Sequence, residues 1–531
     1  MNNNLIKNEV FLGIDLGTTT SQMAVVDSAG IVQILPNMDG DMVTPSIVSV
    51  AEKKPTVGKV ARQDRFFNPD KVAEQFKKAM ATVTDSGDHI PVITGTDGTE
   101  FTAVMLSAEV INYLKESAEK LLGQTIEKAV ISVPAYFEII AKKATKDAGL
   151  TAGFKEVHIV DEPTAGATFY GLTKGQEQKI AVFDLGGGTF DISILQLKAD
   201  ATIDQIAVDG DPECGGSNID EAIFRRVCEF VESKGGKLDR QRDPAEWIEA
   251  LDACKQAKEM LAHKDTVIIP LRVGSDRFSM EITYDQLKEY SGEVIKTLRD
   301  CCTRVLQKEN LNPSEIDNVV LIGGSGRLRF VPEIIKDIFG KEPVTDTDPD
   351  MAVAKGNAIL AAAYFAKSGS ELMIGGRKYL TDVINSSRQI AGRDLCVAAI
   401  TGKSGDGRTE YNCPIIPSGA KLPFEATECF TPIDARQAVV QVKLIDGAPG
   451  QLSSNFTPMQ QVEVDVQPTS EAENDGRIEF KVTMDTEGMV DIKVRDKVLN
   501  KPVPIKFKFH TGLSNSQIND QRNQLVARHS S

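Results

Sequence analysis

The stretch Ala181–Asp191, which reads AVFDLGGGTFD, constrains the fold and the chemistry of the chain more than any other segment. Its first residues are apolar and have strand composition, and the strand ends at a carboxylate, Asp184. A run of glycines then leads to Thr189 and Asp191. A strand that ends in a carboxylate and turns through glycines brings bare backbone N–H groups, a hydroxyl and a metal-attracting charge to one point. The stretch therefore predicts a site for phosphate and magnesium.

A second copy of this pattern lies near the N-terminus. Phe11–Thr20 reads FLGIDLGTTT, with an apolar strand that ends at Asp15 and continues through Leu16 and Gly17 into three threonines. Either copy alone is equally consistent with a buried glycine-rich hairpin. Two copies favour a duplicated half, in which two hairpins close on one polyphosphate from opposite sides.

Other nucleotide-binding motifs are excluded by their spacing. The P-loop pattern G-x-x-x-x-G-K-[ST] is absent, because Val397 occupies the first glycine position before Gly402-Lys403-Ser404. The dinucleotide fingerprint is absent as well, because Gly324-Ser325-Gly326 runs on to Arg329.

Composition narrows the class of protein further. A chain of 531 residues predicts about two to four domains. The net charge of −16 argues against nucleic acid as the main partner, since phosphate contacts need a basic face. We expect no signal peptide and no membrane span, because neither pattern is present. The scattered cysteines contain no C-x-x-C pair and the histidines do not cluster, so we expect reduced thiols in a cytoplasmic protein and no histidine-based metal site.

Strand–glycine–helix units recur along the chain as far as about Ala366 and predict an α/β region. Cys214–Asp220 is a glycine-rich turn before a helix, and a helix N-terminus of this kind is a candidate anion site. Asn318–Gly326 is another strand-to-glycine turn. The carboxylates of Ile159–Thr164 (IVDEPT) are equally consistent with a metal or water contact and with a helix N-cap.

The composition changes after this region. We expect residues 1–370 to form the α/β domain and residues 371–382 a linker. From about Val383 to Phe509 the hydrophobic pattern has period two, interrupted by turn dipeptides, which predicts a small antiparallel β domain over residues 383–511. The polar stretch Leu513–Ser531 is expected to fray.

Six motifs of the chain resemble those of the DnaK-type chaperones, the 70-kDa heat-shock family within the actin and sugar-kinase ATPase superfamily. The resemblance covers nearly the whole chain in order. The motifs are GIDLGTTTS at Gly13–Ser21, VPAYF at Val133–Phe137, ATKDAGL at Ala144–Leu150, DEPTAG at Asp161–Gly166, FDLGGGTFD at Phe183–Asp191 and LIGGSGR at Leu321–Arg327.

The resemblance implies a two-lobed, actin-like (ribonuclease H-like) α/β ATPase domain, then a linker and an antiparallel β-sandwich that grips extended peptides. The implied cofactors are ATP or ADP and Mg²⁺, with K⁺ as a further candidate. The implied partners are unfolded or extended client peptides, a J-domain co-chaperone and a nucleotide-exchange factor, with no nucleic acid and no membrane. The helical lid that follows the sandwich in this family is expected to be missing.

The resemblance also implies roles for individual residues. Magnesium and its waters would be held by Asp15 and Asp184, with Glu162 beside them. The catalytic residues would be Arg62, Glu162, Asp184, Thr189 and Asp191. The nucleotide would be bound by Gly17, Thr18, Thr19, Thr20, Gly186, Gly187, Gly188, Gly215, Gly216, Lys258, Gly324, Ser325, Arg327 and Asp350. Val440 and Val442 are candidates for the peptide groove, with the sandwich core as an equal alternative.

The chain departs from the family pattern at several positions. Arg62 stands where the family has a catalytic lysine, and Lys59 is a candidate substitute. On the adenosine-contacting helix the matching positions are Lys255, Lys258, Glu259 and Ala262, of which only Lys258 keeps its type. Glu259 cannot make the cation–π contact that an arginine makes over a purine. The leucine-rich linker of the family is reduced to Lys378–Asp382, and His158 replaces an arginine among the groups, including Lys142 and Lys146, that receive the interdomain signal.

Two functions follow from these patterns. The first is an ATP-dependent chaperone. It is favoured by the presence of Asp15, Glu162, Asp184, Thr189 and Asp191. The second is a nucleotide-gated binding scaffold or holdase with little or no hydrolysis, which Arg62, Lys255 and Glu259 favour. A filament protein or sugar kinase of the same superfamily is a distant third, because the β domain argues against both.

Overall fold

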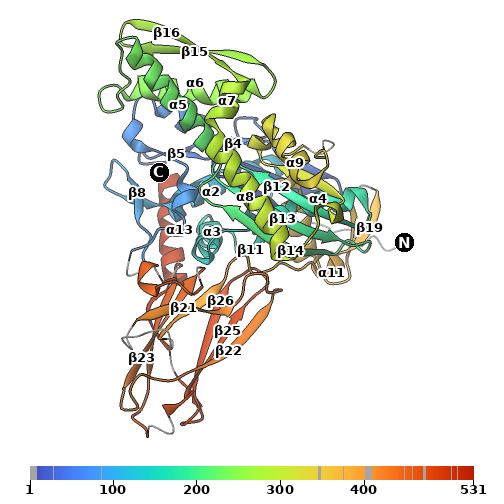
Figure 1. The fold of residues 1–531 in the computed structure, drawn as a ribbon, viewed down its shortest axis with the longest axis vertical. Helices are drawn as coiled ribbons and strands as arrows, with labels where there is room; N and C mark the ends of the chain where they lie inside the picture. The colour runs from blue at the N-terminus through green and yellow to red at the C-terminus, as the bar shows by residue number, and fades with distance from the viewer. Residues whose placement is uncertain are drawn as a thin grey trace.

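The computed structural model describes residues 9–530 except 28, 85–86, 345–347, 375, 401–408, 448, 457, 471–473, 504 and 511. Figure 1 shows an upper body of mixed helices and strands and, below it, a β-sandwich drawn in orange and red. Within the described residues, none of the helices combines the length and the apolar character that crossing a membrane requires.

Lobe I is built on a six-stranded sheet with the strand order β11-β10-β1-β2-β3, in which β4 also pairs with β2. Strands β1 and β2 form an antiparallel hairpin, and β1 pairs in parallel with β10. Helices cover both faces of the sheet, so apolar residues of its central strands are buried on both sides. The main elements are β1 (Leu12–Leu16), β2 (Thr20–Val26), β3 (Val32–Ile34), β4 (Thr44–Pro45), β10 (Lys128–Val133), β11 (Glu156–Asp161), α2 (Ala103–Leu122), α3 (Ile139–Thr151) and α10 (Ala352–Phe365).

Lobe II repeats this plan. Its sheet has the order β14-β13-β12-β17, with an antiparallel β12–β13 hairpin and a parallel β12–β17 pair. The sequence prediction of two equivalent hairpins is therefore confirmed. The elements are β12 (Gln178–Leu185), β13 (Phe190–Leu197), β14 (Ile203–Asp211), β17 (Asn318–Ile322), α4 (Glu162–Lys174), α8 (Gly292–Lys308) and α9 (Phe330–Phe339).

Helices α4 and α10 pack against each other in the core that the two sheets share. A Cβ atom added to Gly356 of α10 would lie 1.8 Å from the carbonyl oxygen of Ala165 in α4. Only a glycine permits this backbone approach, which sets the distance between the lobes. The cleft between the β1–β2 and β12–β13 hairpins follows from this packing.

Each lobe carries a smaller subdomain beside the cleft. In lobe II these are helices and the long β15–β16 hairpin, at the top of Figure 1. In lobe I a three-stranded sheet β6-β5-β7 packs beside short helices. The elements are α5 (Gly216–Ser233), α6 (Pro244–Leu261), β15 (Thr266–Val273), β16 (Asp276–Thr283), β5 (Ile47–Ser49), β6 (Thr56–Val57), β7 (Val72–Glu74), α1 (Lys59–Asp64) and the 3₁₀ helix η2 (Phe76–Ala79).

The predicted linker is folded in the structure. Within the predicted range 371–382, β18 (Glu371–Ile374) pairs antiparallel with β19 (Arg377–Leu380), and α11 (Thr381–Ile384) follows. The alternating apolar residues Leu372 and Ile374 are buried in the core shared with α10, which explains why the segment is ordered. The connection between the domains lies further on, where Arg388 pairs with the edge of β14 through hydrogen bonds to Ile203 and Gln205.

The predicted antiparallel β domain is confirmed as two sheets that share one core. Val442 is 5% exposed and packs within that core, which favours the core alternative, and its place in a peptide groove stays a prediction. Val440 is half-buried on the same face of its strand. The strands are β20 (Leu395–Ile400), β21 (Glu410–Ile416), β23 (Val439–Asp446), β24 (Gln460–Asp465) and β28 (Ile505–His510) in one sheet, and β22 (Phe424–Phe430), β25 (Ile478–Met484), β26 (Val490–Asp496) and β27 (Lys501–Pro502) in the other.

The C-terminal segment does not fray. It forms helix α13 (Asn515–His529), which starts at a capping box on Ser514 and packs on lobe I beside α3 (Figure 1). Leu525 enters the core of lobe I, and both Arg528 and His529 pair with the buried carboxylate of Glu109. The prediction failed because the helix is mostly polar and only a few of its residues make these contacts.

Candidate functional site

A cavity of about 420 Å³ lies between the two hairpins. Most of the predicted site residues line it. These are Asp15, Gly17, Thr18, Thr19, Thr20, Glu162, Asp184, Gly186, Gly187, Thr189, Lys258, Gly324, Ser325, Arg327 and Asp350. Gly188, Gly215, Gly216, Asp191 and Arg62 are not among its lining residues, all of which belong to the described part of the chain.

The two hairpins meet at their glycines. A Cβ atom added to Gly187 would lie 2.4 Å from Cγ2 of Thr19, and one added to Gly188 would lie 2.7 Å from Cγ2 of Thr18. A Cβ added to Gly215, before α5, would lie 2.6 Å from the backbone of Gly188. These glycines are therefore required for close approach of the loops, and Gly188 and Gly215 act behind the cavity wall.

The N-terminus of α5 is not the free anion site that the sequence suggests. The N–H of Gly216 donates to the carbonyl of Gly186 at 3.0 Å, and the N–H of Ser217 donates to that of Gly187 at 2.7 Å. The third N–H, of Asn218, donates to the carbonyl of Gly215. The start of α5 therefore braces the β12–β13 loop, and its first amides are already hydrogen-bonded.

Four carboxylates, of which Asp15 is partly buried and the other three are buried, gather at the floor of the cavity or directly behind it. Asp15 ends β1, Glu162 begins α4, and Asp184 and Asp191 face each other across the β12–β13 pair. Burial, reinforced by the charge of Glu162, raises the pKa of Asp15 to about 7 and that of Asp191 to about 8. The same causes raise the pKa of Asp184 well above its ordinary value.

Asp191 supports the site from behind. Its Oδ1 accepts a hydrogen bond of 2.9 Å from the N–H of Tyr136, in the VPAYF segment. Thr189 lines the cavity whereas Asp191 does not, and the predicted contact of Asp191 with an attacking water stays a prediction.

The carboxylates fit a magnesium ion that arrives with a phosphate ligand. No three His, Cys, Asp or Glu residues in the described ranges lie close enough to hold a metal alone. Magnesium is usually held by one or two carboxylates together with substrate phosphates and waters, which matches Asp15 and Asp184. A bound cation would favour the ionised form of these acids and so lower their raised pKa values.

A lysine that the sequence argument overlooked lies among these acids. Lys77 of η2 is 3% exposed, and its Nζ lies 2.8 Å from Oε1 of Glu162. Its charge lowers the pKa of Asp15, Asp184 and Asp191 and so opposes the effects of burial and of the neighbouring acids. The adjacent Lys78 donates to Oγ of Ser217 at 3.2 Å, beside the glycine loops. No local motif marks these lysines, because their sequence context is that of an ordinary amphipathic turn.

Arg62, the predicted catalytic cation, lies elsewhere. It belongs to α1 and lines a neighbouring cleft of about 340 Å³ on the other side of Thr18 and Thr19. The same cleft contains Arg65, whose guanidinium pairs with Asp252 of lobe II at 2.7 Å and with Glu74 of lobe I at 2.8 Å. Lys59 is mostly exposed and pairs with Asp41 at 2.6 Å. The structure brings neither Arg62 nor Lys59 to the carboxylates.

The opposite end of the cavity is lined by α6 and by the turn after β17. Lys258 is held by Asp220 at 2.8 Å and by the carbonyl of Gly216 at 3.0 Å. Arg327 pairs with Asp350 at 2.7 Å and with Asp348 at 2.8 Å. Lys255, Glu259, Ala262 and His263 complete this end. The predicted nucleoside residues are therefore together, with Glu259 where a stacking arginine was expected.

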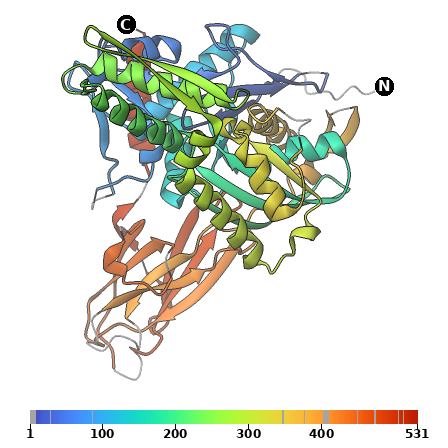
Figure 2. The ribbon, with the colours of Figure 1, turned by 45° about the horizontal axis from the view of Figure 1, so that its top comes forward.

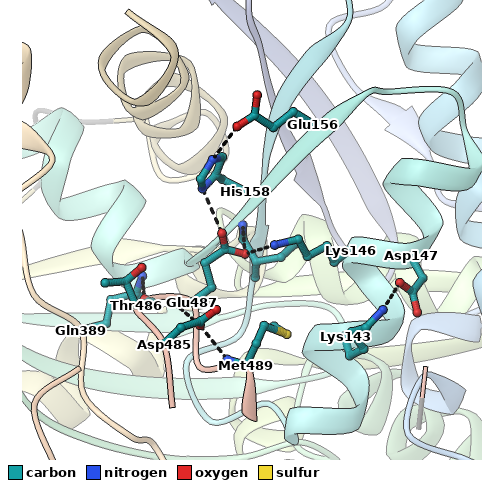
Figure 3. Close-up of polar contacts among 11 residues, drawn as sticks. Lys143, Lys146, Asp147, Glu156, His158, Gln389, Asp485, Thr486, Glu487 and Met489 are labelled. Atoms are coloured by element: carbon teal, nitrogen blue, oxygen red, sulfur yellow. Dashed lines mark hydrogen bonds and ion pairs between the residues drawn. The ribbon is translucent and has the colours of Figure 1, made fainter. Parts of the chain in front are cut away.

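A cluster of polar contacts joins lobe I to the sandwich (Figure 3). Glu487, in the turn between β25 and β26, contacts Nζ of Lys146 at 2.6 Å and Nδ1 of His158 at 2.9 Å. Nearby, Asp446 of the sandwich accepts from the N–H of Ile139 at 2.8 Å. Of the groups expected to receive an interdomain signal, Lys146 and His158 therefore contact the sandwich directly, whereas Lys142 pairs with Asp161 inside lobe I.

Comparison with known proteins agrees with this geometry. Residues 11–530 match the family model described as Hsp70 protein. The chain is 32% identical over 501 residues to the chaperone protein DnaK of Thermotoga neapolitana, covering 92% of this chain and 79% of that protein. It is 31% identical over 523 residues to the chaperone protein DnaK of Thermosipho melanesiensis, covering 97% and 82%.

Proposed function

The chain belongs to the Hsp70 family, and from this premise we propose that it is an ATP-dependent molecular chaperone. ATP binding and hydrolysis in the two-lobed domain would control the binding of extended, unfolded peptide segments by the β-sandwich. The observation that carries the proposal is the cavity between two equivalent glycine hairpins, with Asp15, Glu162 and Asp184 at one end and the α6 residues at the other.

The chemistry that this cavity supports is phosphoryl transfer to water. Positioning and charge neutralisation supply most of the catalysis in such reactions. The loops at Gly17–Thr20 and Gly186–Thr189 would hold the phosphates, and Asp15 and Asp184 would hold Mg²⁺, which supplies positive charge against the phosphate oxygens. Thr189 and Glu162 are the groups placed to orient the attacking water. Arg327 and Asp350 would border the nucleoside.

Coupling to the sandwich would pass through the contacts of Glu487 and Asp446 with lobe I. Glu487 comes from a turn and Asp446 from the end of β23, and because both contact lobe I, a change in lobe I can alter their partners. Val440 and Val442 remain our candidates for the peptide groove. A J-domain co-chaperone, a nucleotide-exchange factor and a cytoplasmic location belong to the same proposal.

A nucleotide-gated holdase is the second candidate, and the side chains of α6 favour it. Glu259 is exposed and offers no cation for an adenine face, so affinity for the base would be lower by about 1–2 kcal/mol if that contact is lost. In this case the protein would bind nucleotide and peptide yet leave ATP intact.

One experiment separates the two candidates. Single-turnover hydrolysis of ATP is measured with Mg²⁺ titrated, beside the affinity for a fluorescent extended peptide in ATP and in ADP, with Asp184→Asn as the inactive control. Hydrolysis that depends on Mg²⁺ and on Asp184, with a peptide affinity that differs between the nucleotides, supports the chaperone. Intact ATP together with a nucleotide-dependent peptide affinity identifies the holdase, and a peptide affinity that is independent of nucleotide contradicts both.

A further inference from the structure

Gln22 is a polar side chain at the cavity that the sequence patterns do not mark. It belongs to β2 and is 4% exposed, and it lines the cavity between the hairpins. Its Oε1 is buried and has no hydrogen-bond partner among the described residues. A buried amide oxygen without a donor is destabilising, and such groups are rare in folded proteins. The side chain therefore points to a partner that the chain itself does not supply.

Strand pairing places Gln22 beside Asp15. The two residues lie opposite each other in the antiparallel β1–β2 pair, so their side chains stand on the same face of the sheet. The Cβ atoms of such a pair are about 4.5–5.5 Å apart. Both residues line the cavity. Because the terminal torsion of a glutamine is broad, the amide can turn its oxygen toward whatever Asp15 holds.

A neutral acceptor suits this position better than a further acid. Burial, followed by the charge of Glu162, already raises the pKa of Asp15 to about 7. Another carboxylate beside Asp15 would add to this repulsion, whereas an amide oxygen accepts hydrogen bonds without carrying a charge.

The waters of a magnesium ion need acceptors of this kind. Mg²⁺ keeps several waters when it is bound by one or two carboxylates and by substrate phosphates. Each of these waters turns its oxygen to the metal and its hydrogens outward, so the surrounding protein has to accept hydrogen bonds from them. Groups of this outer kind hold the ligands of a metal in place. Gln22 offers such an oxygen next to Asp15, with no other donor to satisfy it.

We propose that Gln22 positions the magnesium nucleotide, its side-chain oxygen accepting a hydrogen bond from a water of the hydrated ion that Asp15 holds. This inference rests on the proposed binding of ATP or ADP with Mg²⁺. Gln22 is a positioning residue in this arrangement, because it acts through a water and does not touch the reacting phosphate. The amide is unpartnered in the free protein and partnered in the loaded one. Gln22 therefore lowers the stability of the free protein and raises its affinity for the metal nucleotide.

The test compares Gln22→Met, which removes the amide at similar length, with a matched control at Gln178. Gln178 is also buried, at 8% exposed, but its Oε1 accepts a hydrogen bond of 2.7 Å from Nδ2 of Asn318. It is not among the described residues that line the cavity. ADP affinity is measured by titration calorimetry at increasing Mg²⁺ concentration, and thermal unfolding is followed without nucleotide or metal.

Gln22→Met should raise the Mg²⁺ concentration needed for half-maximal ADP affinity by about tenfold or more, the usual loss when an outer partner of a metal site is removed. Its ADP affinity in EDTA should stay within about twofold of wild type. Its melting temperature without ligands should equal or exceed that of wild type, because no hydrogen bond is lost. Gln178→Met should melt earlier than wild type and keep the wild-type Mg²⁺ requirement. Gln22→Glu keeps an oxygen acceptor, so its Mg²⁺ requirement should not rise, while the added acid lowers its melting temperature.

Three results overturn the inference and leave the proposed function standing. The first is a wild-type Mg²⁺ requirement in Gln22→Met. The second is a requirement in Gln22→Glu that rises above that of wild type, and this variant decides if Gln22→Met does not fold. The third is a melting temperature of Gln22→Met as low as that of Gln178→Met, which would show that the amide has a partner within the protein. If ADP binding by the wild type is independent of Mg²⁺, the proposed magnesium site fails and the inference falls with it.

Discussion

The imidazole Nδ1 of His158 lies 2.9 Å from Oε1 of Glu487 and links lobe I to the sandwich across the domain boundary (Figure 3). The imidazole of His158 also packs against two aromatic rings. It stacks on Tyr364 with ring centres 5.1 Å apart and meets Phe365 edge-on with ring centres 5.2 Å apart. The charged groups around it are Glu156, 3.4 Å from Nε2, and Lys146, which shares Glu487. A titratable residue thus occupies an interdomain ion pair.

Docking of the sandwich on lobe I is expected to weaken as the pH rises. The hydrogen bond and charge of Glu487 raise the pKa of His158 above its usual value near 6.5, although burial and Lys146 oppose the shift. Burial raises the pKa of Glu487, but hydrogen bonds from His158 and Lys146 outweigh it and leave that pKa lowered. The pair therefore stabilises docking fully between the usual pKa of glutamate and the usual pKa of histidine. This contribution is lost as the pH rises through the raised pKa of His158 in the folded protein. Small-angle scattering between pH 6 and 8.5 should show a growing radius of gyration, whereas His158→Arg should remove the dependence. An equal pH dependence in both proteins would contradict the prediction.

We expect that shortening one side chain, that of Leu525, detaches α13 from lobe I. Leu525 is 5% exposed in the core of lobe I, and a Leu→Ala change at such a site costs about 2–5 kcal/mol. Hydrogen exchange of the α13 amides should therefore accelerate strongly in Leu525→Ala. The neighbouring Val526 is 53% exposed, so Val526→Ala is the matched control and should leave exchange nearly unchanged. Equal protection in the two variants would show that Leu525 does not hold the helix.

The sandwich should depend on a buried ion pair. Arg477 and Asp496 are almost fully buried, and Nη2 of Arg477 donates to Oδ2 of Asp496 at 2.6 Å. Arg477→Met leaves a buried carboxylate without its cation, which costs about 3–5 kcal/mol. Urea unfolding of the whole chain should show an earlier transition for the sandwich. Arg436→Met, at a mostly exposed arginine, should shift it by less than about 0.5 kcal/mol. A shift of less than about 0.5 kcal/mol for Arg477→Met would contradict the prediction that the sandwich depends on this ion pair.

Two adjacent glycines of the phosphate loop should respond differently to alanine. A Cβ on Gly187 would meet Thr19 at 2.4 Å, whereas the nearest atom to a Cβ on Gly186 is 3.5 Å away. Gly187→Ala should therefore force the hairpins apart and weaken nucleotide binding by about tenfold or more, a cost of about 1.4 kcal/mol. Gly186→Ala should weaken it far less. Titration calorimetry measures the ADP affinity of both variants. Similar affinities for Gly187→Ala and Gly186→Ala would show that the close approach of the two hairpins does not limit nucleotide binding.

Local pattern predicted most of the residues that the structure brings together around the cavity between the hairpins. Asp15 and Asp184 end strands and are followed by glycine turns, so the neighbouring residues alone fix where these side chains lie. The antiparallel sandwich was predictable for the same reason, because the period of two fixes which residues face inward, although it could not decide whether Val442 belongs to the groove or the core.

Tertiary structure decided which cation reaches the carboxylates. Arg62 and Lys77 are both basic residues in short helices, and the sequence offers no reason to prefer Lys77. The left-handed turn at Gln75 and the anchoring of Phe76 and Met80 direct Lys77 inward, while Arg62 faces the cleft beyond Thr18.

The placement of the chain's last helix was decided in the same way. The buried residue Glu109 pairs with His529, which lies 420 positions later in the sequence. The sequence by itself determined the two hairpins, their acids and the β-sandwich, since these depend on residues adjacent in the chain. Only the folded chain determined the inward position of Lys77, the pairing of β18 with β19 and the docking of α13, because each depends on burial against residues distant in sequence.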